Sequence, residues 1–166
     1  SKTVYVCGQG SDAKTWLLSF DPATKKLAGF ASADENGIAT NSPMQSVVAA
    51  DKVLVVYSGG GGKPDGLIVE WDVATRKPTN QWTLPGILDP MGLAAIPGAA
   101  GEYVVVDNNW ALTEVKEGKL ARVKLESGKK EATVTVIATK LKGGVSCAFG
   151  ADRTLYVTQL GDEFDK

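Results

Sequence analysis

Short runs of apolar and β-branched residues, each about five to seven residues long, recur along the whole chain. In the middle of the chain they occupy residues 45–49, 53–58, 67–73 and 79–84, and turn-forming clusters rich in Gly, Pro, Asp and Lys separate them. Apolar residues at helical spacing are too few to bury a face anywhere, even over residues 109–118, the best helical candidate. The pattern therefore predicts an all-β chain.

The pattern also repeats, with a period of about 51 residues. Residues 20–26 (FDPATKK) return as 71–77 (WDVATRK) and, in altered form, as 125–130 (LESGKK). A polar turn followed by a β-rich run occurs at 51–57, 101–107 and 152–158, with a fourth copy at 1–7. Such a period indicates units that bury their apolar faces only by stacking on one another. Phe20 and Trp71 are equivalent in this repeat, so we expect both in the core between neighbouring units.

Each complete repeat contains four candidate strands, here called A to D in chain order. Four-stranded antiparallel units in series are the blades of a β-propeller. The first repeat begins at strand B and the last ends after strand B. We therefore predict a single β-propeller unit over residues 1–166, with a partial blade at 1–33, blades at 44–85 and 90–138, and a partial blade at 143–160.

About three blades are too few to close around a channel, because propellers have at least four. We expect half, or a fragment, of a roughly six-bladed ring. Either the chain belongs to a longer propeller, or a second copy of the chain completes the ring as a homodimer. A two-layer sandwich of the same strands is the alternative fold, although a sandwich does not require the repeat.

Composition excludes several classes of function. The net charge is −1 and no block of like charge is present, so nothing in the sequence points to nucleic acid or to a membrane surface. No apolar run approaches the roughly 18 residues of a membrane-spanning helix. The chain contains no histidine, which excludes Ser-His and Cys-His nucleophiles and the commonest zinc ligand. Ser1 is not an initiator Met and no signal peptide is visible, so we expect a processed or cut N-terminus. The expected location is secreted or extracytoplasmic.

The two cysteines, Cys7 and Cys147, both lie in strand-like runs. Buried free thiols are one interpretation. A disulfide across the ring closure is the other, but the repeat places Cys7 level with Thr158 and Cys147 opposite Leu155. That offset is about 10 Å along a strand, beyond the roughly 7 Å between Cα atoms that a disulfide spans. We therefore expect no disulfide.

The units at residues 90–125 and 143–159 resemble blades of the gluconolactonase and senescence-marker-protein group of six-bladed propellers, and more loosely those of the NHL-repeat propellers. Residues 104–109 (VVVDNN) look like strand B and its end in that group, and residues 122–128 (RVKLESG) look like strand C and its turn. The resemblance covers about three-quarters of the chain. It implies a propeller of this broad kind and does not specify an activity, because blade geometry accounts for most of the pattern.

Enzymes of that group hold a divalent metal, usually calcium, in the central channel, with an Asp or Asn at the start of strand A as a ligand. The matching positions here hold Met44, Met91 and Gly143. Thioether sulfur is a poor calcium ligand, and glycine has no side chain. We therefore expect no cofactor. Calcium, with Asp89 and Asp107 as weak candidate ligands, is the alternative that the resemblance implies.

Four residues around the third repeat are the candidate binding site: Asp89, Asn108, Asn109 and Trp110. Asp89 precedes Pro90 in a loop on the channel side, if the propeller is correct. Asn108 and Asn109 end a strand, where we expect their side chains to turn toward solvent, and Trp110 follows as a possible exposed stacking residue. The competing interpretation is structural: a solvated turn carboxylate, a polar Asx turn and a Trp that caps the blade core.

The sequence favours a non-catalytic binding or interaction propeller that uses the channel mouth and the blade loops. A calcium-dependent lactonase-type hydrolase and a propeller lectin are the alternatives. The expected partners are a second copy of the chain or the remaining blades, and a small molecule or carbohydrate.

Overall fold

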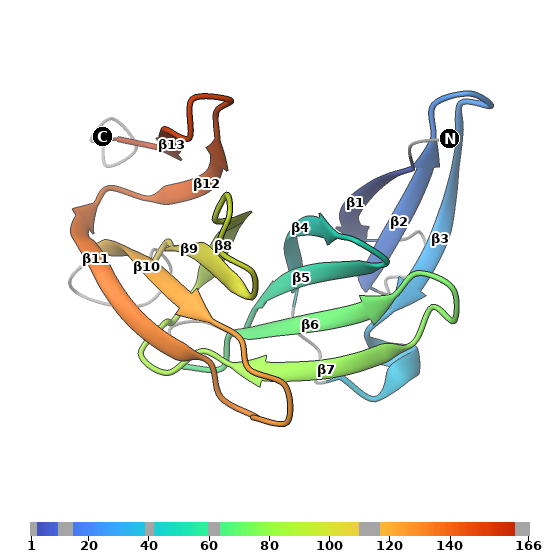
Figure 1. The fold of residues 1–166 in the computed structure, drawn as a ribbon, viewed down its shortest axis with the longest axis horizontal. Coiled ribbons are helices and arrows are strands. Elements are labelled where there is room, and N and C mark those ends of the chain that lie inside the picture. Colours follow the sequence, from blue (N-terminus) through green and yellow to red (C-terminus); the bar gives the residue numbers. More distant parts are fainter. Residues whose placement is uncertain (1–2, 10–14, 39–41, 60–63, 110–116, 162–166) are drawn as a thin grey trace.

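The computed structural model describes residues 3–9, 15–38, 42–59, 64–109 and 117–161, and these form an all-β chain of antiparallel sheets (Figure 1). The described residues contain thirteen strands and one short 3-10 helix, η1 (Asp34–Asn36), between the first two sheets. None of the helical structure described here is long and apolar enough to cross a membrane.

The strands form four successive sheets, which we call blades 1 to 4. Blade 1 consists of β1 (Val4–Gln9), β2 (Thr15–Asp21) and β3 (Lys26–Ser32). Blade 2 consists of β4 (Ser42–Ala49), β5 (Lys52–Ser58), β6 (Leu67–Asp72) and β7 (Pro78–Thr83). Blade 3 consists of β8 (Pro90–Ala95), β9 (Glu102–Asp107), β10 (Gly118–Lys124) and β11 (Thr133–Leu141). Blade 4 consists of β12 (Gly144–Phe149) and β13 (Leu155–Gln159).

The turn after strand C explains why the repeated Asp-x-x-Thr motif forms a hairpin. The Asp72 carboxylate accepts hydrogen bonds from the Thr75 backbone N–H at 2.7 Å and from its hydroxyl at 2.8 Å. Asp21 makes the corresponding turn in blade 1, where it accepts from the Ala23 N–H at 2.9 Å. A left-handed residue closes each of the two hairpins, Lys25 in blade 1 and Arg76 in blade 2.

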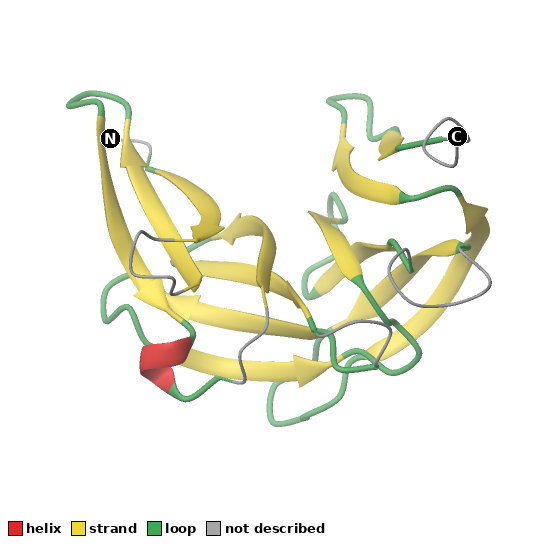
Figure 2. Cartoon of the chain, turned by 180° about the vertical axis from the view of Figure 1, so that it is seen from behind, coloured by secondary structure: helices red, strands yellow, loops and turns green. Residues whose placement is uncertain are grey.

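The blades follow one another along an open arc, and the first and last blades flank its opening (Figures 1 and 2). The strand A elements of successive blades lie side by side, because β4 contacts β8 and β8 contacts β12. Antiparallel blades of this kind, arranged around an axis, form a β-propeller, and the sequence-based fold class is confirmed.

Apolar side chains fill the three boundaries between blades. Each strand B alternates, so that one side faces the preceding blade and the other the following blade. In β5, Val53 and Val55 pack toward blade 1, whereas Leu54 and Val56 pack toward blade 3. Trp71 is fully buried at the boundary of blades 1 and 2, as the repeat predicted, whereas its equivalent Phe20 is only half-buried and lies outside these cores. The third boundary contains Val104, Val106 and Cys147, among others.

Cys7 and Cys147 are both free thiols. Cys147 pairs with Val157 rather than with Leu155 as expected, and it packs at the boundary of blades 3 and 4. Burial raises the pKa of Cys7 to about 11 and that of Cys147 to about 12. Both thiols therefore act as small apolar core groups at neutral pH.

Candidate functional site

The loop before β8 and the loop after β9 meet at one end of blade 3, because Pro90 at the start of β8 pairs with Asp107 at the end of β9. Three candidate residues, Asp89, Asn108 and Asn109, adjoin these two positions. We call the group Asp89, Asp107, Asn108 and Asn109 the mouth edge. All four side chains are buried, so the expectation that Asn108 and Asn109 turn toward solvent is wrong. Trp110 lies outside the described residues.

Asp107 holds the loop before β8 in place. Its Oδ1 accepts hydrogen bonds from the backbone N–H groups of Asp89 at 2.8 Å and Leu88 at 3.3 Å. Burial raises the pKa of Asp107, and the nearby Asp89 carboxylate raises it further. The two N–H donors and the positive charge of Lys119 oppose this shift. Asp107 is therefore a buried carboxyl group that is harder to ionise than an ordinary aspartate.

The backbone of Asp89 is satisfied, but its side chain is not. Its carbonyl oxygen accepts the Asn108 N–H at 2.8 Å, whereas its Oδ2, like the Oδ2 of Asp107, is buried without a hydrogen-bond partner. Lys119 Nζ donates to the carbonyl of Gly86 at 3.1 Å. Two neighbouring carboxyl groups thus share a buried edge, and each keeps one acceptor oxygen unused.

Asn108 and Asn109 connect the mouth edge to other parts of the chain. Asn108 Nδ2 donates to the Gly144 carbonyl at 2.8 Å and so ties blade 3 to the start of blade 4, but its Oδ1 is buried without a partner. Asn109 adopts a left-handed backbone with φ of 48° and donates through Nδ2 to the Glu117 carbonyl at 3.1 Å. The structural interpretation therefore accounts for the amide donors of both residues and leaves the Asn108 Oδ1 unexplained.

The unpartnered oxygens lie on two sides of the blade. Along β9, Asp107 continues the side of Val105, which faces blade 2, whereas Asn108 continues the side of Val106, which faces blade 4. Asp107 Oδ1 accepts the Asp89 N–H and the two carboxyl groups interact electrostatically, whereas the Asn108 side chain lies on the other side of the sheet from Asp107. Within the part of the chain that the structure describes, no three His, Cys, Asp or Glu side chains gather as a metal site would require.

The calcium site of the gluconolactonase group does not fit this chain. Of the three matching positions, Met44 is half-buried and packs against the core between blades 2 and 3, and Met91 is half-buried at the start of β8. Gly143 adopts a left-handed backbone with φ of 61° and supplies no side-chain ligand. These residues offer no oxygen ligand from a side chain, so we derive no chemistry through such an ion.

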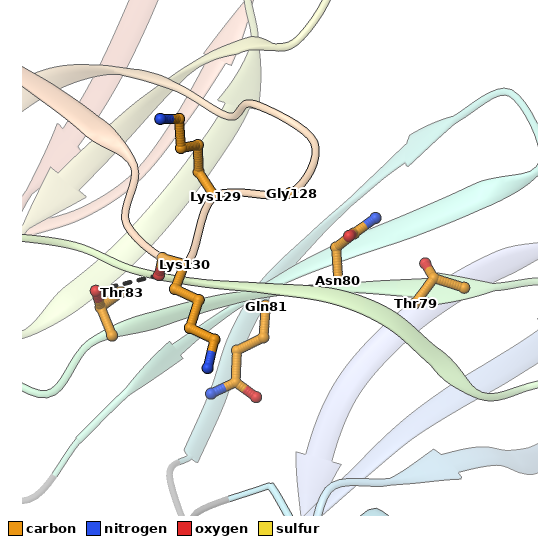
Figure 3. A pocket seen from close by; sticks show the side chains of 7 residues that line it. All are labelled: Thr79, Asn80, Gln81, Thr83, Gly128, Lys129 and Lys130. Atoms are coloured by element: carbon orange, nitrogen blue, oxygen red, sulfur yellow. Dashed lines mark hydrogen bonds between the residues drawn. The ribbon is translucent and has the colours of Figure 1, made fainter.

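A hollow that the sequence did not indicate lies between blades 2 and 3, at their outer rim (Figure 3). Its volume is about 480 Å³, and it is lined by Thr79, Asn80, Gln81, Thr83, Gly128, Lys129 and Lys130. A parallel bridge between Thr83 and Glu131 joins the two blades here, and the Thr83 hydroxyl donates to the Lys130 carbonyl at 3.4 Å. The adjacent lysines of this turn were the only sequence signal, and surface lysines alone do not identify a site.

Comparison with known proteins supports the fold. No protein-family model and no curated protein sequence matches the chain. Its structure is similar to that of the Dos1 propeller, with a TM-score of 0.54 and 14% sequence identity. The match covers 95% of this chain and 40% of the Dos1 chain. At this identity the likeness shows the fold alone: the chain is part of a β-propeller, a general scaffold for binding and interaction.

Proposed function

We propose that this chain is a non-catalytic binding propeller whose site is the mouth edge of blade 3. The observation that carries this proposal is the pair of buried oxygens, Asp89 Oδ2 and Asp107 Oδ2, that have no donor. Leaving a buried acceptor unsatisfied costs about 1 to 3 kcal/mol, and more for a charged group. Each of these oxygens is therefore available to accept a hydrogen bond from a bound group.

The chemistry of the pair defines the ligand. Both groups are acceptors, and when both are ionised they place two negative charges next to each other. A bound group must therefore bring positive charge, hydrogen-bond donors or both. We propose a cationic ligand group small enough to enter this buried edge, either a metal ion or a protonated amine or guanidinium. A neutral sugar, as a lectin would bind, supplies donors but leaves the charge uncompensated.

The hydrolase alternative lacks a specific observation in its favour. The chain has no histidine to act as a general base. Residues matching the calcium ligands of the lactonase group are Met44, Met91 and Gly143, as described above. The resemblance to that group therefore supports a common propeller architecture, and binding is the simpler function for the mouth edge.

The experiment is a thermal melt with three separate probes: calcium chloride, arginine amide and glucose. We expect one of the two cationic probes to raise the melting temperature in a saturable way. At a probe concentration of about 100 times Kd, the expected gain is about 2.7 kcal/mol. Asp107→Asn should remove the effect of that probe. The matched control Asp152→Asn, an exposed turn aspartate on blade 4, should retain it.

Two results would contradict the proposal. One is a melting temperature that neither cationic probe changes. The other is an equal increase in Asp107→Asn and in the unaltered chain, because binding would then occur elsewhere. A saturable effect of glucose alone would favour the lectin alternative instead.

A further inference from the structure

The outer strand of blade 2, β7, already pairs with one residue of the neighbouring blade. The Thr83 N–H donates to the Lys130 carbonyl at 2.9 Å, and the Thr83 carbonyl accepts the Ala132 N–H at 3.0 Å. These bonds form an isolated parallel bridge between Thr83 and Glu131. Blade 2 has all four of its strands and lies between blades 1 and 3, so this edge does not depend on where the sequence begins or ends. The outer edge of β7 therefore accepts main-chain pairing.

The pairing stops one step back along β7, at Gln81. Gln81 lies opposite Val69 on β6, two residues before the pair of Thr83 and Leu67. Backbone groups alternate in direction along a strand, so the N–H and carbonyl of Gln81 point to the same outer edge as those of Thr83. Among the described residues, neither group has a main-chain partner at that edge. An exposed, unpaired edge of this kind is a template for another strand.

The hollow at the rim of blades 2 and 3 lies along this unpaired edge (Figure 3). Its lining includes Thr79, Gln81 and Thr83 of β7 and, from blade 3, the turn of residues 128–130. A strand rises about 3.3 Å per residue, so the step from Thr79 to Thr83 covers about 13 Å, the length of about four extended residues. The volume of about 480 Å³ falls within the range of about 300 to 1,000 Å³ that is typical of ligand sites. The hollow therefore has the length and the volume for a short extended peptide.

Two adjacent lysines give the hollow a positive wall. Lys129 and Lys130 are exposed, and neither forms an ion pair within the described part of the chain. Figure 3 shows the side chains of Lys130 and Gln81 on one side of β7 and that of Asn80 on the other. The Asn80 side also carries Glu70, whose Oε1 accepts a hydrogen bond from Asn80 Nδ2 at 2.8 Å. A peptide on this edge therefore meets positive charge on the Gln81 side, and its carboxylates belong there.

We propose that an extended, acidic peptide segment of a partner protein adds to β7 as a further strand of blade 2. Its main chain hydrogen-bonds to the N–H and carbonyl of Gln81, and its alternate Asp or Glu side chains lie toward Lys130. In this mode of recognition the main-chain hydrogen bonds supply affinity and the alternate side chains supply specificity. The site is independent of the mouth edge, because it lies at the outer rim and takes a ligand of the opposite charge.

The first test is peptide binding, measured by fluorescence anisotropy. The probe is a labelled, end-capped hexapeptide of three Glu-Val repeats, and we expect saturable binding to the 166-residue chain. The double variant Lys129→Gln/Lys130→Gln should bind about tenfold more weakly, because it removes charge-assisted hydrogen bonds. The matched control is Lys25→Gln/Lys26→Gln, which removes two charges from the equivalent turn of blade 1 and should bind as the unaltered chain does.

N-methylated peptides test the main-chain pairing directly. One analogue is methylated at its three Val nitrogens and the other at its three Glu nitrogens. Successive N–H groups of a strand point in opposite directions, so only one analogue loses the N–H that pairs with the Gln81 carbonyl. That analogue should bind about tenfold more weakly, and the other should keep the affinity of the parent peptide. Amide hydrogen exchange, followed by NMR, should become slower at Gln81 when the parent peptide is bound.

Three outcomes would overturn the inference. The first is the absence of saturable binding of the parent peptide. The second is equal weakening in the two double variants, which would show a general attraction between charges. The third is binding of both N-methylated analogues with the affinity of the parent peptide and unchanged exchange at Gln81, which would show that the hollow binds carboxylates without strand pairing.

Discussion

Asp107→Asn should stabilise the ligand-free protein at neutral pH, because the substitution keeps the oxygen that accepts hydrogen bonds and replaces the oxygen that has no partner. The amide Oδ1 can still accept the N–H groups of Leu88 and Asp89. The amide nitrogen replaces an unpartnered charged oxygen with a donor next to the Asp89 carboxylate, whose Oδ2 also lacks a partner. A buried, unsatisfied group costs about 1 to 3 kcal/mol, so we expect a gain of about 1 to 2 kcal/mol in the free energy of unfolding.

The gain should depend on pH in a defined direction. The pKa of Asp107 is raised in the folded state. At pH values between the pKa of the unfolded state, about 3.9, and the higher pKa of the folded state, the folded protein therefore binds more protons at this position than the unfolded chain does. Stability of the unaltered protein therefore falls as pH rises through that window. Asp107→Asn does not titrate at this position. Its advantage should be small below about pH 4 and should grow until Asp107 is ionised in the folded protein.

The assay is urea unfolding followed by tryptophan fluorescence, in chelator and without added amines, at a series of pH values. Asp107→Ala is the companion variant. It loses both accepted hydrogen bonds and should be less stable than the unaltered chain by about 1 to 3 kcal/mol. Asp152→Asn is the control, and its effect on the pH dependence of stability should have the opposite sign, because hydrogen bonds from Thr154 lower the pKa of Asp152. The reasoning fails if Asp107→Asn is the less stable protein at neutral pH, or if its advantage is independent of pH.

Three further predictions concern the fold. Trp71→Ala should lower the free energy of unfolding by about 3 to 5 kcal/mol, because Trp71 is fully buried. Phe20→Ala, at the equivalent but partly exposed position, should lower it by about 1 kcal/mol in dilute solution. Equal losses in the two variants would contradict this difference in burial. The pKa of Asp72 is strongly lowered, mainly by its hydrogen bond with Lys52. The stability that this group contributes above about pH 4 should therefore be lost as the pH falls further. Asp72→Asn should weaken this pH dependence of the free energy of unfolding, measured in urea. Cys147 is buried and its thiol pKa is raised, so it should react with a thiol reagent at neutral pH only upon unfolding, and rapid labelling of Cys147 in the folded chain would contradict its burial.

The repeat predicted the fold because it records both local turn chemistry and strand spacing. The Asp21 and Asp72 turns, the strand order of the blades and the burial of Trp71 all follow from the sequence. The side that each strand presents was harder to predict. Aligned without gaps, the copies at 1–7 and 51–57 place Val4 level with Leu54, but the strand register makes Val4 equivalent to Val53. A shift of one residue moves a side chain to the opposite face of a sheet.

The mouth edge was only partly predictable for a related reason. The sequence identified Asp89, Asn108 and Asn109 as polar residues at loop positions, and the structure brings them together. Their burial depends on partners that no local pattern reveals, such as the Gly144 carbonyl, which lies 36 residues from Asn108. A polar residue at a strand end looks solvated until the neighbouring blade is placed beside it.

Comparison of blades 2 and 3 gives the strongest support for the proposal that Asp107 belongs to a binding site. The same place in blade 2 holds Tyr57, since Tyr57 pairs with Pro43 as Asp107 pairs with Pro90. Tyr57 is almost fully buried and packs in the core between blades 1 and 2. The blade architecture therefore accepts an apolar body at this position and does not require a carboxyl group. A fold that keeps a buried carboxyl group with an unpartnered oxygen, where a neighbouring blade uses a core aromatic residue, gives up stability at that position, and such local inconsistencies occur chiefly at functional sites.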